Sequence, residues 1–194
     1  MPLFPAFVSL KGKKILVVGG GKVATRKVEK LLPFGGEITV VAPKVSKELK
    51  KLAKEKRIKL KRRRFLTGDL RGAFMVIVAV DDIDLQRRIF NLCQKRGILC
   101  NSVDSPDYCN FIFPALVVRG DLVIGITTSG KAPALSREVR KLIEKTLPEE
   151  LERILETLYR ERERLPKGSE RQKYLSRLAS EWLNSLRGKE FPSP

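Results

Sequence analysis

The N-terminal half of the chain alternates between short apolar runs and longer stretches in which apolar residues recur with a helical period. Continuous β-branched runs such as KKILVV and FMVIVAV are typical of strands that are buried on both faces of a sheet. The expected strands cover residues 13–18, 37–42, 57–65, 74–80 and 98–103, and the expected helices cover residues 22–34, 47–56 and 84–96. Strands and helices that alternate over short connections predict an α/β fold with a parallel sheet covered on both faces.

The pattern changes after Phe113, where this alternation stops. Two apolar runs on either side of the Gly-Asp pair at 120–121 predict an antiparallel β-hairpin. Amphipathic helices follow, interrupted by Pro148 and by a Pro-Lys-Gly turn at 166–168. The expected strands cover residues 114–119 and 122–128, and the expected helices cover residues 133–145, 149–165 and 169–186.

We therefore expect three parts in the chain. They are an α/β domain at residues 1–113, a small α+β region with the hairpin and one helix at residues 114–147, and a C-terminal helical segment at residues 148–194. The residues from Gly188 onward are expected to form a frayed tail.

Composition excludes several kinds of catalytic site. The 194 residues include no histidine, so a Ser-His-Asp triad, a histidine metal site and a histidine base are excluded within the chain. The three cysteines, Cys93, Cys100 and Cys109, form no CxxC pair. We expect them to be reduced thiols in or near the core, and we expect no metal site.

The chain is strongly basic, with 40 lysines and arginines against 22 acidic residues and a net charge of +18. This balance predicts attraction to nucleic acid, a membrane surface or a multiply charged metabolite, although a charged surface of the thermophile kind explains part of it. No apolar stretch is long enough to cross a bilayer, and the N-terminal segment does not resemble a secretory signal. We therefore expect a soluble, cytoplasmic protein without a membrane partner.

A G-x-G-x-x-A motif lies between the first expected strand and the first expected helix. Its residues are Gly19, Gly20, Gly21, Lys22, Val23 and Ala24. Gly19 permits a tight turn, Gly21 lets the backbone approach a pyrophosphate, and Ala24 lets the helix pack closely on the sheet. The pyrophosphate would lie against free N–H groups at the helix N-terminus. This placement predicts a Rossmann-type dinucleotide-binding domain, the alternative being a glycine-rich turn without a ligand.

The end of the second expected strand lacks the acid that usually holds the ribose in an NAD site. The stretch reads Val41-Ala42-Pro43-Lys44. Lys44 at this position either favours a 2′-phosphate or is a solvated loop residue, so the residues alone leave NAD and NADP open.

Two acidic sites follow strands whose carboxyl ends are expected at the ligand-binding edge of the sheet. Asp81-Asp82 follow FMVIVAV and are expected to cap the next helix, with a cofactor contact from Asp81 as the second interpretation. Asp104 follows ILCNSV and precedes Ser105-Pro106, so a local turn contact is the alternative to a catalytic role. Because the chain has no histidine, Asp104 is the candidate general base.

These motifs together resemble the precorrin-2 dehydrogenase family, which includes the N-terminal module of siroheme synthase. The resemblance covers about residues 1–145 and depends on the segments ILVVGGGKVATRK, VVAP, VAVDD, CNSVDSPDYCNFIFPA and TTSGKAPALSREVR. It implies a homodimer that uses NAD to oxidise precorrin-2, a tetrapyrrole, to sirohydrochlorin in siroheme biosynthesis. Some members also insert ferrous iron into sirohydrochlorin, so ferrochelatase activity is a further implication.

The resemblance also implies roles for single residues. It assigns Lys22, Val23, Pro43 and Lys44 to the NAD site, and this favours NAD over NADP. It makes Asp104 the catalytic aspartate of an N-x-V-D-x-P motif that begins at Asn101. The hairpin and the segment after it correspond to the family's dimer region, near the substrate cleft.

Within that segment, Thr128 falls where some members carry a regulatory phosphoserine. A contact with an anion by Thr128, Ser129 and Gly130 is the alternative interpretation of these residues. We therefore expect Asn101, Thr128, Ser129 and Gly130 to contact the substrate.

Two other classes of function are compatible with parts of the sequence. A nucleic-acid-binding protein with a Rossmann-like core is suggested by the net charge and by the run KRRR at 61–64, but the run lacks interleaved aromatic residues. An NAD-sensing module without catalysis would use the C-terminal helices to dock a partner, although their single apolar stripes are typical of packed cores. We expect no nucleic-acid partner.

Overall fold

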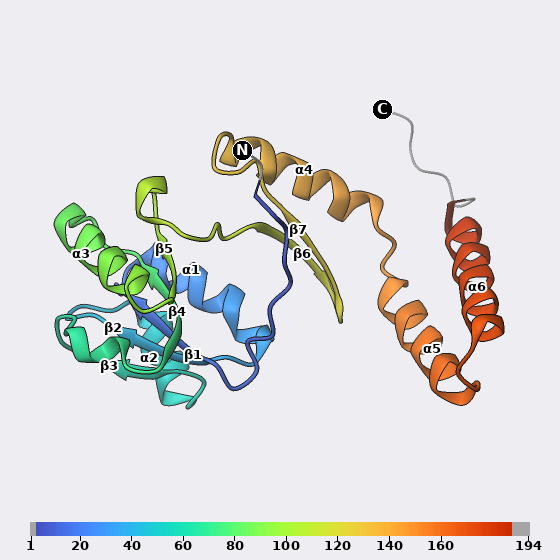
Figure 1. Cartoon of the computed structure of the whole chain (residues 1–194), viewed down its shortest axis with the longest axis horizontal. Helices are drawn as coiled ribbons and strands as arrows, with labels where there is room; N and C mark the ends of the chain where they lie inside the picture. The colour runs from blue at the N-terminus through green and yellow to red at the C-terminus, as the bar shows by residue number, and fades with distance from the viewer. Residues whose placement is uncertain (1–2, 188–194) are drawn as a thin grey trace. The chain divides into compact units, whose positions relative to one another are not determined.

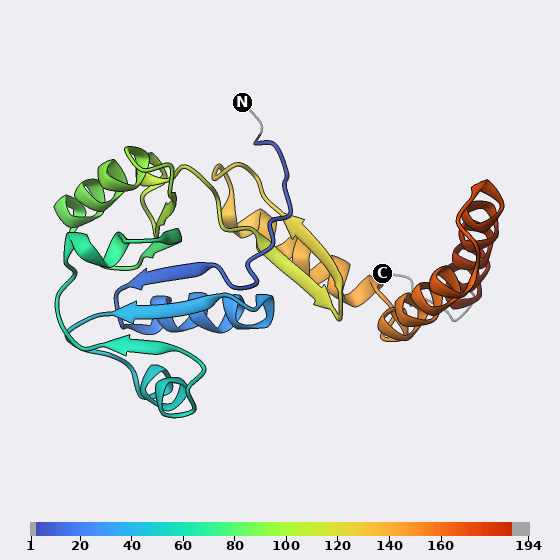
Figure 2. The ribbon, with the colours of Figure 1, turned by 60° about the horizontal axis from the view of Figure 1, so that its bottom comes forward.

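The computed structural model describes residues 3–187, which form two compact units. The first unit, Phe4–Phe113, contains a sheet with the strand order β3-β2-β1-β4-β5 (Figure 1). The strands are β1 (Lys14–Val18), β2 (Glu37–Val41), β3 (Lys59–Lys61), β4 (Ala73–Val78) and β5 (Leu99–Ser102). All neighbouring strands are parallel, and Figure 2 shows the arrows of β1, β2 and β3 running in the same direction. The Rossmann-type parallel sheet predicted from the sequence is confirmed.

Side chains of β1 alternate between two apolar cores, one on each face of the sheet. The helices that cover these faces are α1 (Lys22–Leu31), α2 (Lys47–Lys54) and α3 (Ile83–Gln94). Ile15 and Val17 lie in the core beneath α1 and α2. Leu16 and Val18 lie in the core beneath α3. None of the four is more than 3% exposed, which explains why the strand is a continuous apolar run rather than an alternating one.

The neighbouring strands β1 and β4 lead into helices on opposite faces of the sheet. Ligands of such sheets bind where successive connections diverge in this way, beyond the carboxyl ends of the strands. Backbone hydrogen bonds hold the emerging loops side by side: the Ala79 N–H donates to the Val18 carbonyl at 2.7 Å, and the Gly19 N–H donates to the Val41 carbonyl at 3.0 Å. The fold therefore brings the glycine motif to this edge of the sheet.

The strand predicted at residues 57–65 is wrong in its extent, because β3 covers only Lys59–Lys61. The chain leaves the sheet after Lys61, and the Arg63 guanidinium binds both oxygens of Asp69, at 2.7 and 2.6 Å. Lys61 and the Leu66 N–H also bind this carboxylate, each at 3.0 Å. Asp69 belongs to η2 (Thr67–Leu70), a short 3₁₀ helix that the apolar pattern does not predict. Two residues of the basic run at 61–64, Lys61 and Arg63, are thus paired with the Asp69 carboxylate.

We expect the Asp69→Asn substitution to lower the free energy of unfolding at pH 7 by about 1–3 kcal/mol, since charge-assisted hydrogen bonds are lost at a carboxylate that is 2% exposed. The Arg63 guanidinium holds the pKa of Asp69 well below its usual range, and the Leu66 N–H and Lys61 act in the same direction. Because the pKa of Asp69 is lower in the folded protein, its ionised carboxylate stabilises the fold above the unfolded pKa of about 3.9. This stabilisation is lost as the pH falls toward the folded pKa. The difference between wild type and variant should therefore shrink below about pH 4.

Urea unfolding at pH 7 and at pH 3 measures this effect. The matched control is Glu55→Gln, because Glu55 pairs with Lys51 at 4.0 Å on the exposed surface of the same unit and should contribute less than about 0.5 kcal/mol. If the two variants lost the same free energy of unfolding at pH 7, this would contradict the role given to Asp69.

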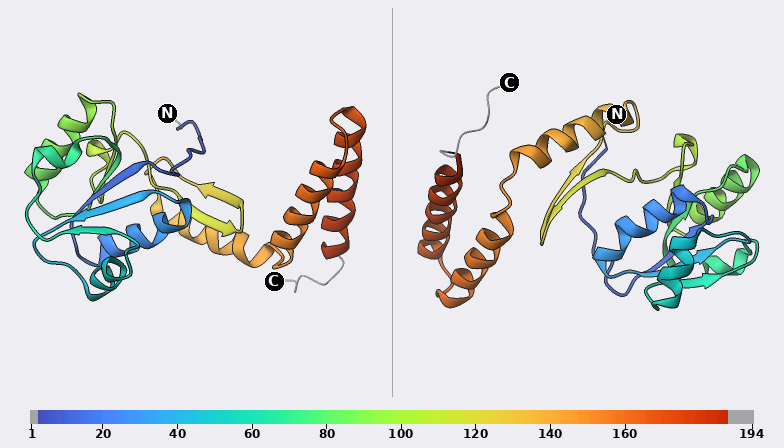
Figure 3. Two further views of the ribbon diagram at one scale, coloured as in Figure 1. Left: turned by 90° about the horizontal axis from the view of Figure 1, so that it is seen from below. Right: turned by 180° about the vertical axis from the view of Figure 1, so that it is seen from behind.

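The second unit starts at Pro114 and contains the predicted hairpin and helices. Its elements are β6 (Ala115–Arg119), β7 (Leu122–Ile126), α4 (Pro133–Thr146), α5 (Leu151–Arg164) and α6 (Ser169–Arg187). The two strands are antiparallel, α4 packs against them, and Figure 3 shows α5 and α6 side by side. The tail predicted from Gly188 onward lies outside the described residues. The domain boundaries expected after residues 113 and 147 stay predictions.

Within residues 3–187, no helix is both long enough and apolar enough to cross a membrane.

Candidate functional site

The glycine motif joins β1 to α1 and leaves the first turn of the helix without a cap. Gly21 is the N-cap residue, and no side chain accepts a hydrogen bond from the helix N-terminus. The first helical hydrogen bond runs from the Thr25 N–H to the Gly21 carbonyl at 3.0 Å. The N–H groups of Lys22, Val23 and Ala24 therefore have no intrahelical acceptor, as is general for a first turn. Such a helix start attracts an anion through its free donors and its dipole.

The three glycines meet different surroundings, and only one of them faces open space. A Cβ on Gly19 would lie 2.1 Å from the Ala79 carbonyl oxygen, and a Cβ on Gly20 would lie 2.2 Å from the Lys44 carbonyl oxygen. A Cβ on Gly21 would meet nothing within 4 Å. The first two glycines are thus required by close backbone packing, whereas the third leaves room in front of the helix start. This arrangement fits the pyrophosphate of a dinucleotide, and the buried Ala24 packs in the core as the motif requires.

A polar contact ties the loop after β2 to the glycine motif. The Ser46 N–H donates to the Gly20 carbonyl at 2.8 Å, and the hydroxyls of Thr25 and Ser46 are 2.9 Å apart. Ser46 also caps α2 by accepting from the Leu49 N–H at 3.1 Å. Sequence analysis missed both Thr25 and Ser46 as parts of the site, although a serine directly before a helical pattern is a common capping signal. Of the predicted residues in this loop, Pro43 and Lys44 are both exposed.

The loop after β4 contains the predicted aspartate pair. Asp82 caps α3 by accepting from the Leu85 N–H at 2.9 Å, as expected. Asp81 is exposed beside it, and its contact with a cofactor stays a prediction. The buried Gln86 amide donates to the Val80 carbonyl at 2.6 Å and so fixes the course of this loop, a contact that no sequence pattern indicated.

Asp104 lies on the loop after β5 in a backbone conformation that few residues adopt. Its φ is +60°, in the left-handed region, and its side chain is exposed rather than packed in the interior. Aspartate tolerates this region better than most residues because its short side chain can bond locally. An exposed carboxylate therefore lies on a tightly turned loop that follows β5, at the carboxyl edge of the sheet.

After this loop the chain runs back alongside β5, and hydrogen bonds between the two segments close the base of the loop. Asn101 is 7% exposed, and its amide donates to the Phe111 carbonyl at 3.1 Å and to the Cys109 sulfur at 3.4 Å. The Cys109 thiol also accepts from the Ser102 N–H at 3.3 Å. Asn101 therefore holds the base of the loop that presents Asp104, and its direct contact with a substrate stays a prediction. All three cysteines are free thiols, and Cys93 and Cys100 are buried.

Lys27 is a residue of this region that sequence analysis missed. Its ammonium nitrogen lies 4.2 Å from the centre of the Phe113 ring, and the side chain is half-buried. The pKa of Lys27 is lowered to about 8, mainly by burial and also by the charges of Lys30 and Arg26, while Cys109 and Asp104 act in the opposite direction. The signal was present, because position 27 falls within the apolar stripe of α1, where a lysine is unusual.

The predicted residues Thr128, Ser129 and Gly130 belong to the second unit, in the turn before α4. The Thr128 hydroxyl accepts from the Ala132 N–H at 3.0 Å, and Ser129 and Gly130 both have positive φ values, of 54° and 82°. The Thr128 hydroxyl therefore stabilises the start of α4. Its contact with an anion or a phosphate group stays a prediction.

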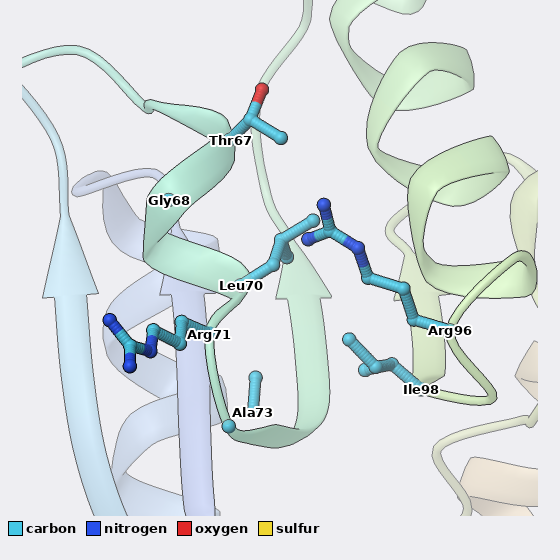
Figure 4. Close-up of a pocket in the computed structure, with 8 residues that line it drawn as sticks. Thr67, Gly68, Leu70, Arg71, Ala73, Arg96 and Ile98 are labelled. Atoms are coloured by element: carbon cyan, nitrogen blue, oxygen red, sulfur yellow. The ribbon is translucent and has the colours of Figure 1, made fainter.

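A cavity of about 590 Å³ opens at the opposite, amino-terminal edge of the sheet (Figure 4). It is lined by Thr67, Gly68, Leu70, Arg71, Gly72, Ala73, Arg96 and Ile98. None of the predicted site residues lines it, so this cavity does not belong to the candidate site. In the part of the chain that the structure describes, no cluster of three or more Cys, Asp or Glu side chains is placed to hold a metal ion.

Two family models match the chain. The model described as “Putative NAD(P)-binding” matches residues 6–115, more than half of the chain, and its match contains the glycine motif and Asp104. The chain belongs to this NAD(P)-binding family. A second model, “Sirohaem biosynthesis protein central”, matches residues 119–146 of this family member.

The NAD(P)-binding chain is also similar to two siroheme synthases. It is 41% identical over 151 residues to a siroheme synthase of Neisseria meningitidis serogroup C (strain 053442), covering 78% of the chain and 32% of the relative. It is 40% identical over 156 residues to siroheme synthase 1 of Serratia proteamaculans (strain 568), covering 80% and 33%. The chain thus spans about a third of the length of these relatives.

A solved structure, “SirC, precorrin-2 dehydrogenase”, matches with a TM-score of 0.75 and 29% identity. The match covers 91% of this NAD(P)-binding chain and 89% of SirC. The family resemblance that the motifs indicated is confirmed by these relatives.

Proposed function

We propose that this chain is an NAD-dependent precorrin-2 dehydrogenase, which oxidises precorrin-2 to sirohydrochlorin in siroheme biosynthesis. The observation that carries the proposal is the likeness to SirC, because it extends over most of both chains and includes both units of the fold. The glycine motif, with its uncapped helix start and the open space at Gly21, supports the use of a dinucleotide. The net charge of +18 suits a substrate that carries several carboxylates.

Each predicted site residue has a role in this proposal. When bound, NAD supplies the acceptor for the hydride that the oxidation removes from the substrate. The N–H groups of Lys22, Val23 and Ala24 hold the pyrophosphate at the start of α1. Pro43, Lys44 and Asp81, on the loops that flank the motif, contribute further contacts with the cofactor.

Asp104 accepts the proton that the substrate loses along with the hydride. The resemblance to the family makes Asp104 the catalytic aspartate, the chain has no histidine to act as a base, and the hydrogen bonds of Asn101 hold the base of its loop. Asn101 thereby acts on the reaction through the position of Asp104. The Thr128–Gly130 turn contributes contacts with the anionic substrate through its backbone and hydroxyl groups.

The homodimer implied by the family is also part of the proposal. Leu135 and Leu142 on α4 are 56% and 65% exposed, and Val118 on β6 is exposed beside a buried Val117. Apolar side chains gathered on a hairpin and its helix are typical of surfaces that bury each other in a symmetric pair.

The test is to incubate the pure protein with precorrin-2 and NAD, and to follow NADH absorbance together with the tetrapyrrole spectrum. We expect one NADH for each sirohydrochlorin formed. Saturable NAD binding without oxidation would instead indicate a sensing module. Tight, salt-sensitive binding of DNA or RNA without turnover would indicate the nucleic-acid class. The ion pairs of Lys61 and Arg63 with Asp69 argue against the latter, since part of the basic run is already neutralised.

Insertion of ferrous iron stays a prediction of the family resemblance, with iron as a substrate rather than a resident metal. Adding ferrous iron to sirohydrochlorin and comparing the rate with the spontaneous one tests it separately. A cytoplasmic location likewise stays a prediction.

A further inference from the structure

The Lys27 ammonium group is held in place but has no acidic partner among residues 3–187. It lies on the face of the Phe113 ring, which favours a cation at this distance and limits the motion of a long side chain. Lys27 forms no salt bridge with any residue between 3 and 187, whereas five other lysines of the described residues do. A half-buried cation held in place but left unpaired is available for an anion that comes from solution.

The groups around Lys27 indicate which anion this is. Lys27 lies over the Phe113 ring, and both Phe113 and Val103, the residue before Asp104, pack against the core beneath α1. The charges of Lys30 and Arg26 on α1 lower the pKa of Lys27, and those of Cys109 and Asp104 on the loop after β5 raise it. The loop that carries Asp104, the group that supplies the reaction chemistry in the proposed function, therefore packs on the same side of the sheet as Lys27. An anion bound at Lys27 would be held beside Asp104.

The position of Lys27 along α1 separates it from the site for the pyrophosphate. Lys27 is the sixth residue after the N-cap Gly21, so the two backbone positions are about 9 Å apart along the axis at 1.5 Å per residue. The free N–H groups end within the first turn, so the Lys27 side chain offers a positive charge in addition to these backbone donors. A carboxylate of the second, anionic reactant suits this position, because the proposed function places that reactant beside Asp104.

We propose that the Lys27 ammonium group binds a carboxylate of the tetrapyrrole substrate and so places its ring beside Asp104. The inference rests on the proposed function for the identity of the substrate. Lys27 is then a substrate-binding residue, and its charge contributes to the affinity for the substrate rather than to the chemical step.

The pH dependence follows from the charge state of the lysine. With a pKa of about 8, Lys27 is charged and able to bind a carboxylate below this pH, and it becomes neutral above it. The substrate carboxylates stay ionised throughout this range, because their pKa values are near 4. The KM for precorrin-2 should therefore rise as the pH increases through about 8, while the substrate itself is unchanged.

The experiment compares Lys27→Met, Lys27→Arg and the control Lys50→Met, which removes one exposed charge from α2 of the same unit. At pH 7, Lys27→Met should raise the KM for precorrin-2 about tenfold, the effect of one charge-assisted contact, with kcat within about twofold of wild type. Its KM should no longer respond to pH near 8. Lys27→Arg should keep a low KM at pH 9, because arginine stays charged. Lys50→Met should behave as wild type.

Equilibrium titration with sirohydrochlorin, followed by absorbance, measures the same contact without turnover. Lys27→Met should weaken this binding about tenfold and leave the Kd for NAD unchanged. An unchanged KM and Kd for the tetrapyrrole, or a loss confined to NAD binding, would overturn the inference. If wild type binds sirohydrochlorin but does not oxidise precorrin-2, the proposed function fails, and the titration still decides the role of Lys27. Thermal unfolding of each variant shows whether the fold is intact.

Discussion

The Asp104→Asn variant is expected to lose about 100- to 10,000-fold in kcat for precorrin-2 oxidation, the range of a missing general base. The affinity for NAD and the free energy of unfolding should change little. Asparagine keeps the size of the side chain and tolerates the left-handed conformation that residue 104 adopts, at φ +60°. Steady-state rates measured by NADH absorbance, with calorimetric titration of NAD as a second readout, test this prediction.

A glycine at the same position separates chemistry from conformation. Glycine adopts positive φ without cost, so Asp104→Gly preserves the turn while removing the carboxylate. Both variants should be inactive if the carboxylate accepts the proton. Activity in either variant would show that the residue serves only the turn, which is the alternative that the sequence left open.

The Gly21→Asp variant is expected to bind NAD at least about 100-fold more weakly than wild type, while its melting temperature stays the same or rises. A side chain at this position enters open space, and its carboxylate would cap the free N–H groups of α1 and repel the pyrophosphate. Stability and binding should therefore change in opposite directions. Thermal unfolding and calorimetric titration with NAD measure the two quantities.

Two matched substitutions show whether the charge or the space is responsible. Gly21→Asn adds almost the same volume without the charge, and we expect it to weaken NAD binding less than aspartate does. Gly19→Ala should instead lower the melting temperature, because its Cβ would collide with the Ala79 carbonyl at a φ of +121°. Unchanged NAD affinity in Gly21→Asp would refute the placement of the dinucleotide at this helix start.

The parts of the fold that depend on local pattern were predictable from the sequence. The apolar run of β1 and the glycine motif carry their signals within a few residues, and Asp82 was recognised as a cap for the same reason. The length of β3 was not predictable, because it depends on the contact of Arg63 with Asp69, which the pattern of alternation does not contain. Strand propensity does not show which acidic residue a charged side chain will pair with.

The candidate site likewise contains residues that could be predicted from the sequence and contacts that could not. Asp104 could be selected because it follows a strand and because the composition leaves few other bases. The contacts that position it could not, since the Asn101 amide reaches Phe111 and Cys109 only after the chain has turned back along β5. Lys27 was overlooked for a related reason: its aromatic partner, Phe113, is distant in sequence.

The backbone at residue 104 also limits which acids natural variation can place there. Glutamate offers the same functional group, but at positive φ a longer side chain costs about 1–2 kcal/mol and shifts the carboxylate outward by one methylene. Asparagine and glycine suit the turn but carry no acid. Aspartate combines a carboxylate with tolerance of the left-handed backbone. We therefore expect a homologue with any other residue at this position to lack this general base or to have a different loop conformation.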